Sequence, residues 1–165
     1  MDQLWAPWRI GYVRSEKRDG CLFCEKSQAD DDRRNLVPAR GELCFVLLNT
    51  FPYNNGHVMV APYEHAADLE ALSAEQCAEL MQLVQRSVEA LKLKFRPDGF
   101  NVGWNLGTVA GAGIADHLHI HIVPRWNGDT SFMPVLSDTS VVCQSLEAAY
   151  EELTEAFSEI ASQEQ

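Results

Sequence analysis

Three histidines alternate with apolar residues in the segment His117-Leu118-His119-Ile120-His121. Side chains of a β-strand alternate between its two faces, so a strand here would carry the imidazoles on one face and the apolar residues on the other. Imidazole titrates near neutral pH, attacks phosphorus as a nucleophile and binds metal ions. The pattern predicts a histidine row for nucleophilic catalysis or metal binding; a polar strand surface without a function is the alternative.

The segment before the histidines is rich in glycine and ends Gly111-Ala112-Gly113-Ile114. Glycine lets the backbone approach a ligand closely, and backbone N–H groups turned toward it suit a phosphate. Because a strand and not a helix follows, the loop is neither a P-loop nor a dinucleotide-binding fingerprint. It predicts a phosphate contact beside the histidines, with a plain hairpin connection as the alternative.

Cys21 and Cys24 form a Cys-x-x-Cys pair, which is one half of many zinc sites. The chain has no second such pair, so two further ligands would come from elsewhere, and His65 and His117 are the candidates. A thioredoxin-type redox role is not favoured, because the pair does not follow the strand of a βαβ unit. Two thiols without a ligand are the remaining alternative.

Apolar periodicity predicts the elements that would position these residues. Strands are expected at residues 43–48, 57–61 and 100–106 and at the histidine segment, and helices at residues 73–95 and 145–160. Ser73 and Gln76 form a capping-box pair at the start of the first helix, whose apolar stripe includes Met81. Strands in hairpin-like succession with two helices indicate an α+β protein, an antiparallel sheet with helices on one side.

A chain of 165 residues, 46% of them hydrophobic, is expected to form one domain with a substantial core. We expect an irregular N-terminal segment over residues 1–40, with a solvated loop from Glu25 to Arg40. The core would span residues 41–126, and a C-terminal loop and helix would span residues 127–165. The odd number of cysteines, five, argues against a disulfide framework.

The net charge of −11 argues against a general nucleic-acid-binding protein, which would carry a basic face. No apolar run approaches the roughly 20 residues that span a bilayer, and the first residues do not resemble a signal peptide. The expected location is the cytoplasm, with neither nucleic acid nor membrane as a partner.

The pattern His-φ-His-φ-His-φ-φ over residues 117–123, where φ is apolar, resembles the signature of the histidine triad (HIT) family. Other segments that resemble family landmarks are, in chain order, Cys21-Leu22-Phe23-Cys24, Asn55-Gly56-His57-Val58-Met59-Val60 and Pro62-Tyr63-Glu64-His65. The flanks Leu4-Trp5-Ala6-Pro7-Trp8-Arg9 and Arg125-Trp126-Asn127-Gly128-Asp129 are similar to a bacterial branch related to diadenosine tetraphosphate phosphorylases.

The resemblance implies a nucleotidyl hydrolase or transferase. His119 would attack the α-phosphorus of a nucleoside polyphosphate and form a nucleotidyl-histidine, which water or phosphate would release. His121 would contact phosphate oxygens and help the leaving group, and His57 would support the triad. His117 would orient the site or bind a structural zinc with Cys21, Cys24 and His65.

The resemblance also implies nucleotide contacts and an assembly. Asn105 would contact the α-phosphate, Asn49 would lie near the ribose, and backbone amides of Gly111, Gly113 and Ile114 would bind phosphate oxygens. Members commonly join their sheets across a homodimer and need no organic cofactor. The expected substrate is a dinucleoside polyphosphate with adenine as the base.

One segment departs from the family pattern. Many members carry Gln-Ser or Gln-Thr before the triad, whereas this chain has Gly113-Ile114-Ala115-Asp116. Backbone N–H groups would replace the missing hydroxyl or amide, and the choice of substrate stays open. The rival functions are a nucleoside phosphoramidate hydrolase, a nucleotide-binding module without turnover, and a metalloenzyme that uses the histidines as ligands.

Overall fold

The computed structural model describes residues 20–129 and 144–163. The aromatic flank from Leu4 to Arg9, Cys143 and most of the expected C-terminal loop lie outside the described residues. Within the described part of the chain, no helix combines the length and the apolar character needed to cross a membrane.

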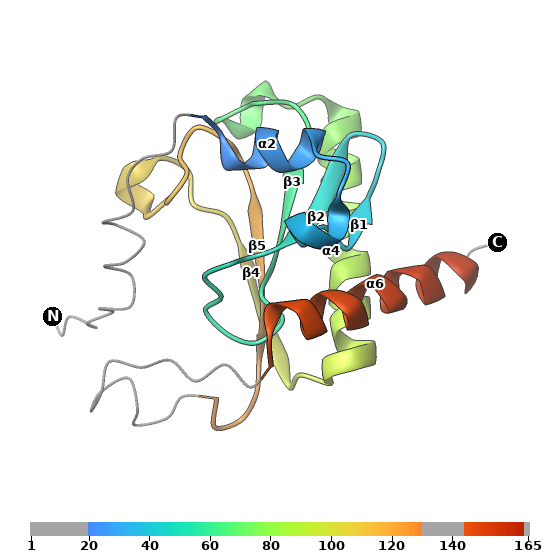
Figure 1. Cartoon of the computed structure of the whole chain (residues 1–165). Helices are drawn as coiled ribbons and strands as arrows, with labels where there is room; N and C mark the ends of the chain where they lie inside the picture. Colours follow the sequence, from blue (N-terminus) through green and yellow to red (C-terminus); the bar gives the residue numbers. More distant parts are fainter. Residues whose placement is uncertain (1–19, 130–143, 164–165) are drawn as a thin grey trace, which may run out of the picture.

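Five antiparallel strands form one sheet in the order β1-β2-β3-β5-β4 (Figure 1). Their bounds are Ala39–Arg40 for β1, Cys44–Leu48 for β2, Val58–Pro62 for β3, Gly99–Gly103 for β4 and Ile120–Arg125 for β5. Each pair of neighbouring strands is antiparallel. The predicted α+β architecture is therefore confirmed, and β1 is the strand that the sequence did not predict.

Two long helices cover one face of the sheet (Figure 1). Helix α4 (Ala74–Phe95) packs on the strands, and α6 (Leu146–Gln163) packs on α4. The side chains of Ser73 and Gln76 form the predicted capping box at the start of α4. Met81 is half exposed, because the buried stripe of α4 runs instead through residues such as Leu83 and Ala90. The prediction for Met81 was wrong.

A second apolar cluster lies on the opposite face of the sheet, under two short helices. Phe23 of α2 (Leu22–Gln28) is fully buried there against strand residues that include Phe45 and Met59. Helix α3 (Asp32–Asn35) follows, and single 3₁₀ turns occur at Leu69–Ala71 (η1) and Thr108–Ala110 (η2).

The segment from Glu25 to Arg40 is thus not the solvated loop that its charge pattern predicted. The Arg40 guanidinium donates to the backbone carbonyls of Lys26, Ser27 and Ala29 at the C-terminal end of α2. The buried Lys26 ammonium donates to the carbonyl of Asn35 at 2.6 Å. Charged side chains here satisfy helix ends, which a composition argument cannot distinguish from solvation.

Two predicted strands also have different limits. β4 ends at Gly103, so Trp104 and Leu106 lie beyond it and are exposed. β5 begins at Ile120, so His117 and His119 precede the strand. Ahead of β5, the Leu118 N–H donates to the carbonyl of Ala66 at 2.7 Å. This hydrogen bond joins the segment before β5 to the segment after β3.

Candidate active site

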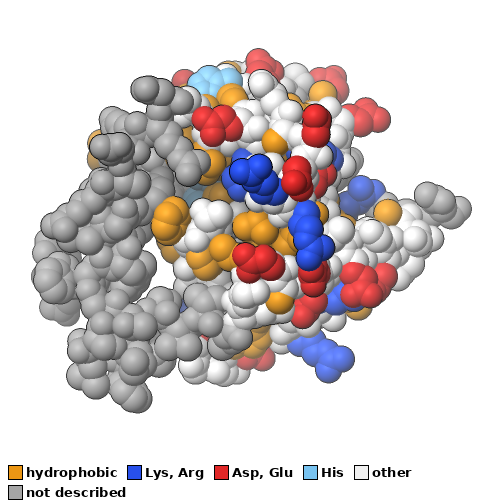
Figure 2. All heavy atoms as spheres, in the orientation of Figure 1, with side chains coloured by type: hydrophobic (Ala, Val, Ile, Leu, Met, Phe, Trp, Pro, Cys, Tyr) orange, Lys and Arg blue, Asp and Glu red, His pale blue; other side chains and the backbone are white. Residues whose placement is uncertain are grey.

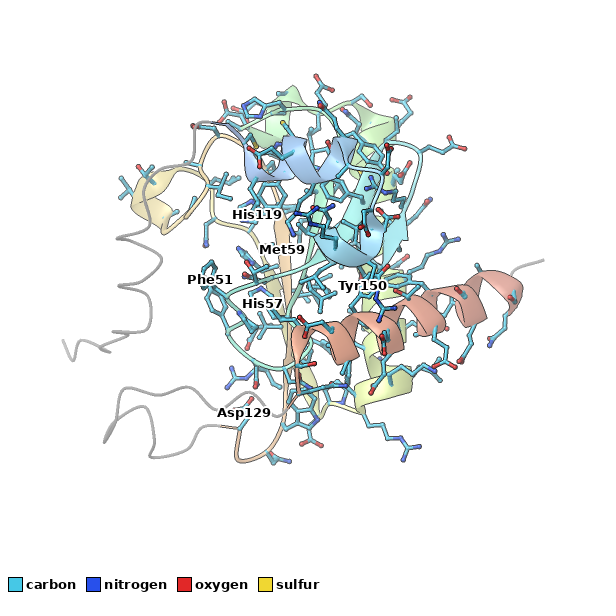
Figure 3. All side chains as sticks on the ribbon, viewed as in Figure 1. Phe51, His57, Met59, His119, Asp129 and Tyr150 are labelled. Atoms are coloured by element: carbon cyan, nitrogen blue, oxygen red, sulfur yellow. The ribbon has the colours of Figure 1, made fainter. Side chains whose placement is uncertain are left out.

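The three triad histidines lie on the α2 face of the sheet, as their alternation predicted. The interposed residues Leu118, Ile120 and Ile122 belong to the core under α4 and α6. His121 pairs in register with Met59, a member of the second apolar cluster on the other face. Figure 3 shows His119, Met59 and His57 following one another along the sheet, with Asp129 at the lower end.

The protons of His119 are placed by its surroundings. Its Nδ1 lies 2.8 Å from the carbonyl oxygen of His117, which can only accept, so Nδ1 carries the hydrogen. The lone pair is therefore on Nε2. The side chain is 7% exposed and its imidazole packs 4.6 Å from the ring of Phe23. Burial lowers the pKa of His119, which keeps the imidazole neutral near pH 7.

His57 and His121 form a directed pair. The backbone N–H of Tyr53 donates to Nδ1 of His57 at 3.1 Å, so the hydrogen of a neutral His57 is on Nε2. That Nε2 lies 2.9 Å from Nδ1 of His121 and donates to it. Burial, with the nearby His121 and His119, lowers the pKa of His57 to about 3. A neutral His121 then carries its own hydrogen on Nε2.

His117 faces a different cluster. Its Nε2 donates to the carbonyl of Pro62 at 2.9 Å, which leaves the lone pair on Nδ1. Nδ1 points at the sulfur atoms of Cys21 and Cys24, at 3.3 and 3.6 Å. Nδ1 of His65 lies 3.3 Å from the Cys24 sulfur. The four donor atoms lie within 4.8 Å of one another.

This cluster suits a metal ion. Two sulfur and two imidazole nitrogen donors are a ligand set typical of tetrahedral zinc, and a backbone carbonyl behind a ligand histidine fixes its tautomer. Burial and the neighbouring Cys21 thiol raise the pKa of Cys24, so Cys24 keeps its proton until a cation displaces it. Cys21, Cys24, His65 and His117 could therefore hold a metal, and the lone pair of His117 faces this cluster.

The residues predicted to contact the nucleotide are Asn49, Asn105 and the glycine loop. Asn49 lies beside His57, with its Nδ2 3.4 Å from the Nδ1 of that histidine. Asn105 follows β4, and its side chain makes no hydrogen bond to any residue that the structure describes. Gly111 has a φ of +92°, which favours glycine, and Ile114 packs against the second apolar cluster. The glycine loop thus returns to the face that carries the histidines.

Two residues at the site were not predicted from the sequence. Phe23 packs against the imidazoles of both His117 and His119, with ring centroids 5.0 and 4.6 Å away. Tyr53 packs its ring 4.7 Å from that of His57 in addition to donating its N–H. Phe23 lies inside the Cys-x-x-Cys motif, which is a signal that could have identified it.

The surface around these elements is mixed in charge. Figure 2 shows acidic and basic side chains interspersed over the visible described face, with apolar side chains between them and no basic patch. This agrees with the 24 acidic against 13 basic residues of the chain.

The chain is similar in sequence to a protein family and to named proteins. The HIT domain model matches residues 35–128. An AP-4-A phosphorylase from Mycobacterium tuberculosis is 43% identical over 155 residues, covering 88% of this chain and 79% of the relative. An adenosine 5'-monophosphoramidase from Schizosaccharomyces pombe is 36% identical over 107 residues, covering 65% of this chain and 75% of the relative.

Solved structures show the same fold. A Zn-bound histidine triad family protein from Mycobacterium smegmatis has a TM-score of 0.71 at 26% identity, covering 87% of this chain and 97% of that one. A histidine triad nucleotide-binding protein from Sulfolobus tokodaii has a TM-score of 0.70 at 25% identity, covering 85% and 93% of the two chains.

Proposed function

Because the chain belongs to the HIT domain family, we propose that it cleaves a dinucleoside polyphosphate of the diadenosine tetraphosphate type through a nucleotidyl-histidine intermediate. The relative named AP-4-A phosphorylase, at 43% identity, supports this substrate class. The observation that carries the proposal is the bond from Nδ1 of His119 to the carbonyl of His117, which leaves Nε2 as a neutral nucleophile.

In the first step, Nε2 of His119 attacks an α-phosphorus. A P–N bond forms as the P–O bond to the rest of the polyphosphate breaks. The leaving oxygen accepts a hydrogen bond from Nε2 of His121, whose Nδ1 is held as an acceptor by His57, and the polyphosphate departs as an anion. Replacing one difficult displacement by two easier ones is the benefit of a covalent intermediate.

In the second step, orthophosphate or water attacks the same phosphorus and His119 leaves. With diadenosine tetraphosphate, the first step releases ATP and leaves AMP on the histidine. Phosphate would then give ADP, and water would give AMP. Backbone amides of Gly111, Gly113 and Ile114, with the side chain of Asn105, would bind the phosphate oxygens, and Asn49 would lie near the ribose.

The test is product analysis of the pure protein with diadenosine tetraphosphate, with and without orthophosphate. We expect ATP and ADP in equal amounts, formed only when phosphate is present, as for a phosphorylase. ATP with AMP in the absence of phosphate would assign a hydrolase. No turnover in either tube would reject the dinucleotide substrate and leave a nucleotide-binding module as the rival.

A second candidate is a nucleoside phosphoramidate hydrolase, which the relative named adenosine 5'-monophosphoramidase supports. The same nucleophile would break a P–N bond and release an amine. The discriminating measurement is the ratio of kcat/KM for adenosine 5'-monophosphoramidate and for diadenosine tetraphosphate. A ratio well above one would favour this candidate.

We also propose that Cys21, Cys24, His65 and His117 hold a structural zinc ion. Four protein ligands leave no open position for water, so the ion would brace the segment that carries α2. Cobalt is a coloured substitute for zinc, and we expect the visible spectrum of a tetrahedral site with two thiolates. A Cys77→Ala variant should keep this spectrum. An octahedral spectrum, or none, would contradict the proposal.

We further propose a homodimer in which β4 meets its copy, in a cytoplasmic protein. Within residues 20–129 and 144–163, β4 pairs with β5 alone, and Val102, Trp104 and Leu106 are exposed along this edge. We expect Val102→Glu to halve the mass measured by sedimentation. Leu93→Glu, at another exposed apolar residue, is the control and should leave it unchanged. A monomeric wild-type protein would contradict the proposal.

A further inference from the structure

A side chain eight residues beyond the triad connects two loops. The Asp129 carboxylate is 9% exposed and accepts from Nε of Arg125 at 2.6 Å. It also accepts from the backbone N–H of Trp126 at 3.2 Å and from Nδ2 of Asn54 at 2.9 Å. Asn54 belongs to the loop between β2 and β3, so this bond ties that loop to the turn after β5.

The tied loop is the one that orients His57. Asn54 donates a second bond to the carbonyl of Pro124 at 3.1 Å, and its own carbonyl accepts from the N–H of His57 at 3.2 Å. Tyr53, the preceding residue, donates its N–H to Nδ1 of His57. The position of the Tyr53 amide therefore depends on where Asn54 is held.

We propose that Asp129 is a positioning residue that acts through Asn54 and the Tyr53 amide to fix the direction of the His57–His121 hydrogen bond. It is a positioning residue because its carboxylate acts on the site through Asn54. The consequence for turnover rests on the proposed function, but the tautomer itself does not.

The direction of this bond decides what His121 can present. With a donor at Nδ1, His57 keeps its hydrogen on Nε2 and gives it to Nδ1 of His121, whose hydrogen then lies on Nε2. Without that donor, Nδ1 of His57 faces Nδ2 of Asn49 at the longer distance of 3.4 Å. This weaker contact lets His57 adopt the other tautomer and accept from Nδ1 of His121. His121 would then present a lone pair where the leaving oxygen needs a hydrogen-bond donor.

The experiment compares Asp129→Ala with a control at Asp98, which precedes β4 and contacts the same turn. Asp98 accepts from the backbone N–H of Asn127 at 2.7 Å and has no bond to Asn54, so Asp98→Ala perturbs the turn but not the tie. The first readout is the imidazole ¹⁵N NMR spectrum of the metal-loaded protein, which separates a protonated from an unprotonated ring nitrogen. The second is the pair kcat and KM for diadenosine tetraphosphate.

We expect wild type and Asp98→Ala to hold His57 as a single Nε2–H tautomer, and Asp129→Ala to show a mixture. We expect Asp129→Ala to lower kcat by about 10- to 100-fold with KM changed by less than about 2-fold. The reason is that the defect lies in the hydrogen bond from Nε2 of His121 to the leaving oxygen. Asp129→Asn keeps an oxygen for Asn54 and should recover most of the single tautomer.

Asn54→Ala removes the same tie from the other loop and guards against a folding defect that is specific to Asp129→Ala. It should give the same mixture, and the double variant should add nothing further. If Asp129→Ala and Asn54→Ala lower only the melting temperature and keep the single tautomer, the proposal is wrong. If wild type cleaves no nucleotide, the NMR comparison still decides it, whereas the proposed function alone fails.

Discussion

The two ends of the histidine row are built from the same residue type but are held in different ways. At one end, His117 faces Cys21, Cys24 and His65, whose donor atoms come from distant parts of the chain. At the other end, His57 and His121 are held by hydrogen bonds from the backbone and from the Asn54 loop. A cation would complete the first end, whereas the second is complete without one.

The difference shows how one short segment, residues 117–121, can contribute both to a metal cluster and to a directed pair of histidines. The Cys24 thiol, whose pKa is raised by burial, makes only weak hydrogen bonds to imidazole, so this end depends on a metal ion that displaces its proton. The low pKa of His57 keeps this residue neutral near pH 7, so its Nδ1 stays an acceptor for the Tyr53 N–H. His119 lies between them, bonded to the backbone of His117 and packed against the ring of His121.

The largest effect is expected where the two ends meet. Replacing His119 by Ala should lower turnover of diadenosine tetraphosphate by at least about 10⁴-fold, because no other group can form the covalent intermediate. Cobalt binding at the Cys24 end and the His57 tautomer should both persist, since neither uses the His119 side chain. Rapid-quench measurement of product gives the rate; a loss below about 10-fold would reject His119 as the nucleophile.

Removing a ligand from the metal end should affect stability first. We expect Cys24→Ala to lose zinc, measured by elemental analysis, and to melt about 10 °C lower. An ion present at ~1,000 times its Kd stabilises by about 4 kcal/mol, and each kcal/mol shifts Tm by about 2–4 °C in a chain of this size. Cys77→Ala should retain zinc. Equal melting temperatures for Cys24→Ala and wild type at saturating zinc would show that the ion does not brace the fold.

At the other end, the buried neutral His57 should make the free energy of unfolding depend on pH in acid. The pKa of His57 is about 3 in the folded protein, against an ordinary value of 6.5, so the unfolded chain binds one more proton between these pH values. The free energy of unfolding therefore falls as pH decreases through this window, by at most about 1.4 kcal/mol per unit from this one group. The loss is absent above the upper limit of the window.

Urea unfolding of the metal-free protein between about pH 5 and about pH 8 measures how the free energy of unfolding changes with pH. Without the metal, the pH dependence of metal binding does not enter. A His57→Gln variant should show a shallower slope by about one proton over the acidic part of the range. Identical slopes for the variant and wild type would contradict the assignment of a neutral, buried His57.

The smallest effect should come from the side chain that links the metal end to His119. Phe23→Leu keeps an apolar residue under α2 but loses the tilted ring contacts with the imidazoles of His117 and His119, so we expect kcat to fall by about 3-fold. Phe45→Leu is the matched control, because Phe45 is equally buried in the same cluster but stacks on Tyr63. Both variants should lose about 1 kcal/mol of stability. Equal kcat values would show that Phe23 only fills space.

Local patterns predicted much of the fold. The capping box at Ser73, the alternation around His119 and the two amphipathic helices are set by periodicities of two and 3.6 residues, which any one segment contains. A pattern within one segment does not say what packs against that segment, and this explains the wrong prediction for Met81. Met81 belongs to the apolar stripe by spacing, but which side of α4 is buried depends on what packs against it.

The sequence by itself determined which residue types share a face and that Cys21 and Cys24 come as a pair. Only the tertiary structure decided that His117 turns its lone pair toward those sulfurs while His119 keeps its own on Nε2. It also brought Asp129 to Asn54, residues 75 positions apart in the chain. The physical reason is that a proton on imidazole is placed by the hydrogen-bond partners of each nitrogen, and those partners come from other segments of the folded chain.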